Sequence, residues 1–206
     1  MLNYFENTKK DIHSFWEPVP IEVDEYPHAP WWGYEPVGRS KHNPGAIIAS
    51  AFILFGSEKQ KEIVFSITKE CLAQLVADEE SDDHDCYSLI ALFDKLLSLN
   101  STLITGEHIA ALKRKISNSV CYDENKWNSY VAQPFDFAYS SDSLWYDCVK
   151  DGIEYNFNYW INNLKEEGVW QPHFSWGIDS DASRQATINW TGFLATRRIK
   201  IFKVMG

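Results

Sequence analysis

The side chains in this sequence that could perform acid–base chemistry are His28, His84, Asp85 and Asp136. A histidine titrates near neutral pH and can act as a general acid or base. Asp136 stands between two phenylalanines in "PFDFA", and a carboxyl group desolvated by aromatic rings has a raised pKa, as a proton donor needs. His84 and Asp85 are adjacent in a predicted helix, where neighbouring side chains point about 100° apart, so we expect each to need a partner from another element. Structural alternatives stay open: His28 can bond a backbone carbonyl, Asp85 can cap a helix, and Asp136 can pin a loop.

Aromatic residues supply the candidate ligand-binding surface. Residues 26–35, "YPHAPWWGYE", carry two prolines that favour an extended, rigid strap and hold Trp31 and Trp32 on it. Tryptophan rings give a ligand a flat, polarizable wall and stabilise positive charge. The further binding candidates are Asn43, Trp176 and Trp190. The alternative is structural, with the indole rings of the strap closing one end of a helical barrel.

Composition excludes several classes of function. The formal net charge is −10, which opposes binding to nucleic acid and to anionic membranes. The four cysteines have no CxxC spacing, which favours reduced core thiols in a cytoplasmic protein. The longest apolar run, "AIIASAFILF", is too short to cross a bilayer, and the N-terminal residues lack the apolar stretch of a secretory signal. Nucleotide-loop, serine-hydrolase and metalloprotease motifs are absent, and we predict neither a metal nor a cofactor.

Helical patterns account for most of the chain. We expect helices over residues 44–55, 58–77, 86–99, 107–120, 144–167 and 184–205. Asn43 is predicted to cap the first, Ser57 and Gln60 form a capping box for the second, and Gly168 is predicted to end the fifth. Four basic residues in the last helical turns are expected to be solvated and to complement the helix dipole, and the alternative is that they grip a phosphate: Arg197, Arg198, Lys200 and Lys203. The class is therefore all-α, with antiparallel hairpins in a single domain over residues 1–206.

Three stretches together resemble a group of bacterial proteins related to the terpenoid cyclase and protein prenyltransferase α/α toroids. They are "FWEPVPIEVDEYPHAPWW", "NPGAIIAS" and "HFSWG…NWTGFLATRRIKIF". The resemblance implies an α/α toroid-like fold, an incomplete barrel of helical hairpins with an aromatic-lined cavity. It also implies a structural alternative for "GVWQPHFSWG", as a turn that locks one hairpin against the next. Members of the group carry further hairpins ahead of the segment that begins here, which implies a shortened ring and either a homodimer or a partner subunit that supplies the missing wall.

The resemblance also implies a function. Class II terpenoid cyclases protonate an alkene with a DxDD motif, but residues 82–85 here read Asp-Asp-His-Asp. The zinc ligand set of the prenyltransferases has no recognisable motif here. The first hypothesis is an enzyme that acts by acid–base chemistry on an apolar, isoprenoid-like small molecule. The second is a non-catalytic module that binds a ligand or a protein through the cavity or the open side of the ring.

Overall fold

The computed structural model describes residues 1–8, 16–17, 19–29, 32–34, 42–78 and 82–205. All regular elements of these residues are helices, and no strand occurs among them, so the all-α prediction is confirmed. The described chain forms two compact units, one made of Met1–Val23 and Tyr34–Ser119 and the other of Asp24–Gly33 and Val120–Gly206. The toroid-like arrangement and the single domain over residues 1–206 stay predictions.

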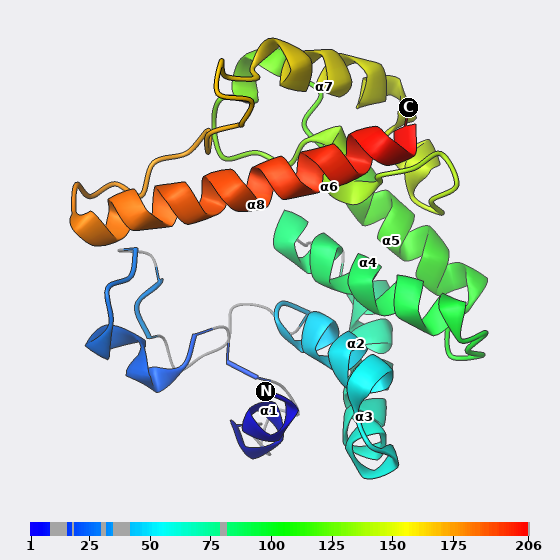
Figure 1. Ribbon diagram of the computed structural model, residues 1–206. Coiled ribbons are helices and arrows are strands. Elements are labelled where there is room, and N and C mark those ends of the chain that lie inside the picture. The colour runs from blue at the N-terminus through cyan, green and yellow to red at the C-terminus, as the bar shows by residue number, and fades with distance from the viewer. Residues whose placement is uncertain (9–15, 18, 30–31, 35–41, 79–81, 206) are drawn as a thin grey trace. The chain divides into compact units, whose positions relative to one another are not determined.

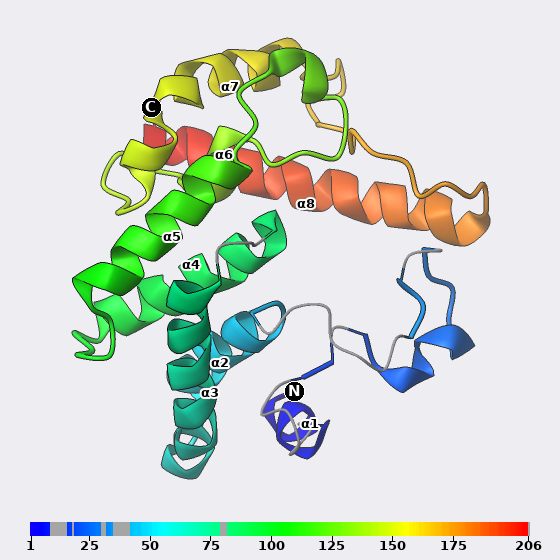
Figure 2. The same cartoon turned by 180° about the vertical axis from the view of Figure 1, so that it is seen from behind.

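The first unit is a group of helices in which α2 packs against both α3 and α4 (Figure 1). Its elements are α1 (Leu2–Thr8), α2 (Gly45–Phe55), α3 (Glu58–Ala77), α4 (Asp83–Ser98) and α5 (Gly106–Ser119). Consecutive helices α4 and α5 lie against each other as a hairpin (Figure 2). The fully buried side chains here include Phe52, Ile67, Leu89, Phe93 and Leu112.

Local signals explain where these helices begin. The predicted capping box is present at α3, because the backbone N–H of Gln60 donates to Ser57 Oγ at 3.4 Å and that of Ser57 donates to Gln60 Oε1 at 3.1 Å. The prediction that Asn43 caps α2 is wrong, because the capping position is Pro44, where no side-chain capping hydrogen bond forms. At α4 the cap is Asp82, whose Oδ1 accepts from the backbone N–H of Asp85 at 2.8 Å.

The second unit is built from α6 (Pro134–Phe137), α7 (Lys150–Asn162) and α8 (Asp181–Met205). Short 3₁₀ turns stand at Glu124–Lys126 and Tyr146–Cys148, and a third, Ile21–Glu25, lies near the N-terminus. The prediction of one helix over residues 144–167 is wrong at both ends. Residues 144–149 form turns, and after Asn163 the chain closes a separate turn between Lys165 and Val169 that Gly168 permits with its φ of +76°.

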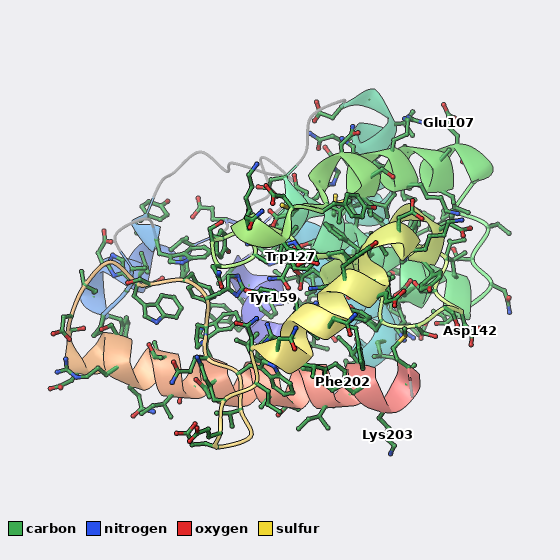
Figure 3. All side chains as sticks on the ribbon, turned by 90° about the horizontal axis from the view of Figure 1, so that it is seen from above. Glu107, Trp127, Asp142, Tyr159, Phe202 and Lys203 are labelled. Carbon is green, nitrogen blue, oxygen red and sulfur yellow. The ribbon has the colours of Figure 1, made fainter. Side chains whose placement is uncertain are left out.

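A buried polar network joins α6 to α7. Gln133 Oε1 accepts from Asn156 Nδ2 at 2.9 Å and from Trp160 Nε1 at 2.8 Å, and the backbone N–H of Phe135 donates to Asn156 Oδ1 at 3.1 Å. Nearby, Trp127 packs edge-on against Tyr159, with ring centres 5.2 Å apart (Figure 3). These satisfied groups fix the part of the fold against which α8 lies.

Helix α8 has two different halves. Its C-terminal half crosses α7 at an angle (Figure 3), and Phe202 contacts the rings of Phe157, Trp160 and Trp170. Its buried residues, Leu194, Arg198 and Ile201, all belong to this half. The N-terminal half extends beyond α7 and buries no residue fully, although it carries large apolar side chains.

Candidate functional site

Aromatic rings gather where the segment before α8 meets the N-terminal half of that helix. We call them the Phe174 cluster, defined by Tyr130, His173, Phe174, Trp176, Trp190 and Phe193. The Phe174 ring makes near-perpendicular contacts with the rings of Tyr130, His173, Trp176 and Trp190 at centroid distances of 5.6, 5.5, 5.2 and 5.6 Å. Trp190 also contacts Phe193 at 5.0 Å. Edge-to-face packing of this kind is the favoured geometry for aromatic pairs.

The Phe174 cluster is only partly covered. Tyr130 is 64% exposed, Phe193 53% and Trp190 37%, so several rings of one packed group meet solvent together. The indole Nε1 of Trp176 is buried and has no acceptor among the residues that the structure describes. Exposed groups of packed apolar side chains mark binding surfaces more often than isolated exposed residues do. Two of the predicted binding residues, Trp176 and Trp190, are thus brought together.

Arg198 lies one helical turn beyond Leu194 and is enclosed by aromatic rings. Its guanidinium carbon lies 4.5 Å from the ring centre of Trp160 and 5.5 Å from that of Trp170. The residue is 6% exposed, and Nε has no acceptor in the described part of the chain. Burial, reinforced by Arg197 and opposed by Asp136 and Tyr159, lowers the pKa of Arg198 to about 10, so the side chain remains charged at neutral pH.

The neighbouring Arg197 is paired. Its Nη1 lies 2.9 Å from Asp136 Oδ1, while Asp136 Oδ2 accepts from the backbone N–H of Gln133 at 2.8 Å and so caps α6. The expectation that Arg197 and Arg198 are solvated is therefore wrong, whereas Lys203 on the same helix is exposed and points away from the unit (Figure 3). Asp136 has the loop-pinning role that was its structural alternative.

His173 links the Phe174 cluster to the arginines. Its ring contacts Phe174, and its pKa is lowered by burial and by the positive charge of Arg198, with Asp136 opposing the shift. A lowered pKa keeps the imidazole neutral at physiological pH. The ionisable side chains that interact with Arg198 are therefore one ion pair, formed by Arg197 and Asp136, and two uncharged groups, His173 and Tyr159.

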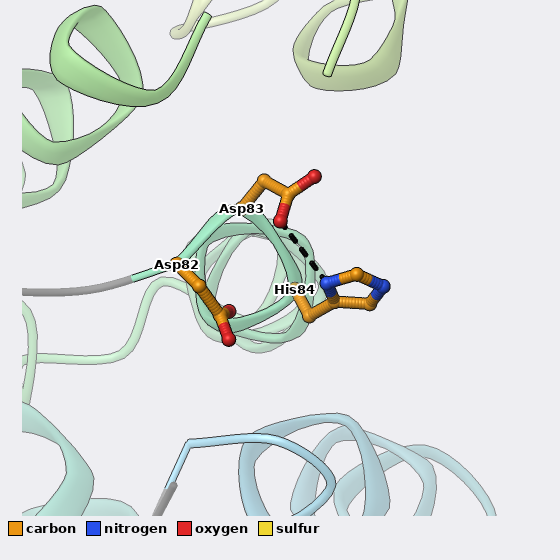
Figure 4. A group of neighbouring side chains, drawn as sticks. All are labelled: Asp82, Asp83 and His84. Atoms are coloured by element: carbon orange, nitrogen blue, oxygen red, sulfur yellow. Dashed lines mark hydrogen bonds and ion pairs between the residues drawn. The ribbon is translucent and has the colours of Figure 1, made fainter. Parts of the chain in front are cut away.

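A separate ionisable group stands at the start of α4, in the first unit (Figure 4). His84 Nδ1 lies 3.0 Å from Asp83 Oδ1, and the hydroxyl of Tyr87 donates to Asp83 Oδ2 at 3.3 Å. The hydrogen bond to Asp83 raises the pKa of His84, with burial opposing the shift. Sequence reasoning missed Asp83 as the partner because it assumed interior-helix geometry for adjacent residues. Asp85 is buried and bonds the cap with its backbone N–H.

The same helix start gathers possible metal ligands. One atom each from Asp82, Asp83 and His84 lies within 4.8 Å of the others. Asp82 is occupied as the helix cap, Asp83 and His84 bond each other, and a helix N-terminus carries partial positive charge that opposes a cation. We therefore assign no metal to these residues.

The remaining predicted site residues have local roles or lie outside the described residues. The His28 ring donates from Nδ1 to the carbonyl oxygen of Tyr26 at 2.7 Å, which is its structural alternative. Trp32 is 42% exposed, and Trp31 falls outside the described residues. Asn43 Oδ1 accepts from Ser88 Oγ at 3.4 Å and so ties the start of α2 to α4.

The chain matches no protein-family model, and no curated protein or solved structure matches it significantly. Among the described residues, no helix combines the length and apolar character needed to span a membrane. The resemblance to the terpenoid cyclase and prenyltransferase toroids stays a prediction.

Proposed function

We propose that this chain is a ligand-binding protein and that the Phe174 cluster takes the apolar body of a small molecule. The observation that carries the proposal is the partly exposed group of rings packed around Phe174. Its members come from three parts of the chain, which are Tyr130, the loop before α8 and α8 itself. A ligand that covered the rings would remove aromatic area from water, at about 25 cal/mol per Å².

The buried Trp176 Nε1 adds specificity to this surface. An indole N–H without an acceptor is costly when it is buried, and a ligand oxygen would satisfy it. Ligand sites in proteins combine mainly apolar walls with a few such polar groups. The candidate acid–base residues do not enter this surface, since Asp136 is paired with Arg197 and His28 with a backbone carbonyl. The proposed role is therefore binding.

The test is the fluorescence of N-phenyl-1-naphthylamine, a neutral dye that brightens in apolar sites. We expect saturable binding to the native protein. Phe174→Leu, which removes the central ring but keeps an apolar side chain, should weaken binding by about tenfold, equivalent to about 1.4 kcal/mol. The matched control is Phe55→Leu, because Phe55 is 73% exposed and lies on α2. Equal losses in the two variants would refute the assignment to the Phe174 cluster.

A second candidate function is acid–base catalysis on an isoprenoid-like molecule, favoured by the hydrogen-bonded Asp83–His84 pair with its partly exposed imidazole. Native mass spectrometry of protein purified from its own host addresses this candidate. The candidate is supported if an isoprenoid-like molecule is bound and the native protein releases it with a changed mass, whereas the His84→Gln variant releases it with its mass unchanged. Recovery of a protein partner alone would count against it.

A further inference from the structure

We propose that Arg198 binds the carboxylate of the ligand whose apolar body lies on the Phe174 cluster. This inference rests on the proposed function and adds the chemical class of the ligand, an apolar monocarboxylate. Its starting point is an arginine that is 6% exposed, stacked on Trp160 and Trp170, and without an acceptor for Nε in the described part of the chain.

The charges around Arg198 do not balance. The nearby acid, Asp136, is held by Arg197 at 2.9 Å and by the capping N–H of Gln133 at 2.8 Å. Two arginines therefore share one carboxylate, which leaves one positive charge in excess. A buried charge needs a counter-charge or hydrogen-bond partners, and a single missing negative charge matches a monoanion better than a dianionic phosphate.

The geometry of a guanidinium group favours a carboxylate in this position. Its central carbon lies 4.5 Å from the ring centre of Trp160 and 5.5 Å from that of Trp170, and its N–H donors all lie in the plane of the group. Because Nε has no acceptor among the described residues, this donor is left for a ligand. A planar carboxylate accepts two parallel hydrogen bonds from the edge of a guanidinium group.

The spacing of residues along α8 places Arg198 near the Phe174 cluster. Trp190, Leu194 and Arg198 follow one another at intervals of four residues, so consecutive members are neighbours on the surface of the helix. Arg198 follows Trp190 by eight residues, a rise of about 12 Å at about 1.5 Å per residue. Within the cluster, His173 contacts Phe174, and the positive charge of Arg198 contributes to lowering the pKa of His173, which places Arg198 near this member of the cluster. A ligand of about this length would place its body on the rings and its carboxylate at Arg198.

The experiment compares an acid with its neutral, planar amide. The probes are 3-(2-naphthyl)propionate and 3-(2-naphthyl)propanamide, titrated into the full chain by isothermal calorimetry at pH 7. We expect the acid to bind at least about tenfold more tightly than the amide, as charge-assisted bonds are stronger than neutral ones. Arg198→Gln should reduce this preference to about twofold, and Arg198→Lys should retain part of it because the charge remains.

Lys203→Gln is the matched control, because it removes the same charge from an exposed position on the same helix. It should leave the acid-to-amide ratio unchanged. Circular dichroism identifies any variant that does not fold. If Arg198→Gln does not fold, the inference is tested by the acid-to-amide affinity ratios of Arg198→Lys and of the native protein. Equal affinity of acid and amide for the native protein, an unchanged ratio in the folded Arg198→Gln variant, or an equal loss in Lys203→Gln overturns the inference.

The outcomes separate this inference from the function on which it rests. If the acid and its amide bind with equal affinity and N-phenyl-1-naphthylamine also binds, the ring surface binds ligands. In that case Arg198 only stabilises the packing of one helix against another. If neither naphthyl probe nor the dye binds, the proposed function fails, and the inference fails with it.

Discussion

Arg197 and Arg198 occupy different environments although they are adjacent. Successive residues on a helix point about 100° apart, which directs Arg197 to the carboxylate of Asp136 and Arg198 to the indoles of Trp160 and Trp170. A cation stacked on tryptophan rings away from water gains about 2 kcal/mol, which offsets part of its desolvation. Arg198 therefore also stabilises the contact between α7 and α8.

The sequence contained a usable signal for this burial. Asp181 is the single acidic residue between positions 181 and 205, so neither arginine has an acidic partner within four residues on its own helix. Partners had to come from another element. The pairing with Asp136, more than sixty residues away, depends on how α6 and α8 pack and has no trace in local periodicity.

At the start of α4, the pair of Asp83 and His84 makes stability depend on pH. The pKa of His84 is raised above 6.5, so its contribution is complete below about pH 6.5 and is lost as pH rises through the folded pKa. Burial acts to raise the pKa of Asp83, but its bonds with His84 and Tyr87 lower it below 3.8 overall. That contribution is present above about pH 3.8 and is lost as pH falls through the folded pKa.

We expect Asp83→Asn to lower the pKa of His84, because the variant removes the carboxylate that favours the imidazolium. The measurement is an NMR titration of the His84 ring proton between pH 4 and 9. Glu62→Gln on the exposed face of α3 serves as the control and should leave the titration unchanged. A His84 pKa that stays raised in Asp83→Asn would show that the pair does not form.

Among the elements, α2, α3 and α8 were predictable because strong local signals mark them. The capping box at Ser57 and the apolar run of residues 46–55 place α2 and α3 within a residue or two. The ends of α7 were not predictable in the same way. Trp145 is fully buried in the turns before it, and burial of a side chain by distant residues overrides the helical preference of residues 144–149.

The close approach of α7 to its neighbours rests on Gly152. A Cβ added there would lie 2.7 Å from Pro134 Cγ and 2.7 Å from Tyr122 Cδ1, which is shorter than carbon atoms tolerate. We expect Gly152→Ala to lower the free energy of unfolding by about 1–3 kcal/mol, because the added methyl group forces α7 away from α6. Urea denaturation followed by circular dichroism gives this value.

Gly192 provides the matched control, since it lies within α8 and a Cβ there meets nothing within 4 Å. Gly192→Ala should raise the free energy of unfolding by about 0.5–1 kcal/mol, because alanine favours the helix. Destabilisation by Gly192→Ala, or tolerance of Gly152→Ala, would contradict the packing described for this unit.

The network between α6 and α7 makes a further prediction. Asn156 is fully buried, and its removal leaves the backbone N–H of Phe135 without an acceptor. We expect Asn156→Ala to cost about 1–3 kcal/mol of unfolding free energy. Asn189→Ala, which breaks an exposed bond with Gln185, should change stability by less than about 0.5 kcal/mol. Similar effects of the two changes in a thermal melt would mean that the network contributes little.

At the scale of the whole molecule, acidity sets which partners are accessible. The net charge of −10 surrounds a local excess of positive charge at Arg198, so selectivity for a carboxylate must come from short-range contacts. The same net charge predicts that duplex DNA binds more weakly than the ~10⁻⁴–10⁻⁶ M typical of non-specific DNA-binding proteins. A gel-shift titration at 150 mM salt checks this, and tight, salt-sensitive binding would contradict it.

The composition and helical periodicity were sufficient to predict an all-α chain. The rings of Trp176 and Trp190, two of the predicted binding residues, lie 6.3 Å apart, and their binding role stays a prediction. The Phe174 cluster itself could not be predicted, because Tyr130 joins it from a segment more than forty residues away. The expected ring of hairpins and the expected homodimer or partner subunit stay predictions, since they concern arrangements beyond the two units.

The most direct measurement of the central claim is the indole N–H spectrum of ¹⁵N-labelled protein titrated with 3-(2-naphthyl)propionate. We expect the signals of Trp176 and Trp190 to move with a common saturation curve, because the naphthyl body of the probe covers both indoles, whose ring centres lie 6.3 Å apart. Trp16, whose Nε1 already donates to the carbonyl of Phe5 at 2.7 Å in the other unit, should not move. Unmoved signals for Trp176 and Trp190, or a shift of Trp16 as large as theirs, would contradict the account.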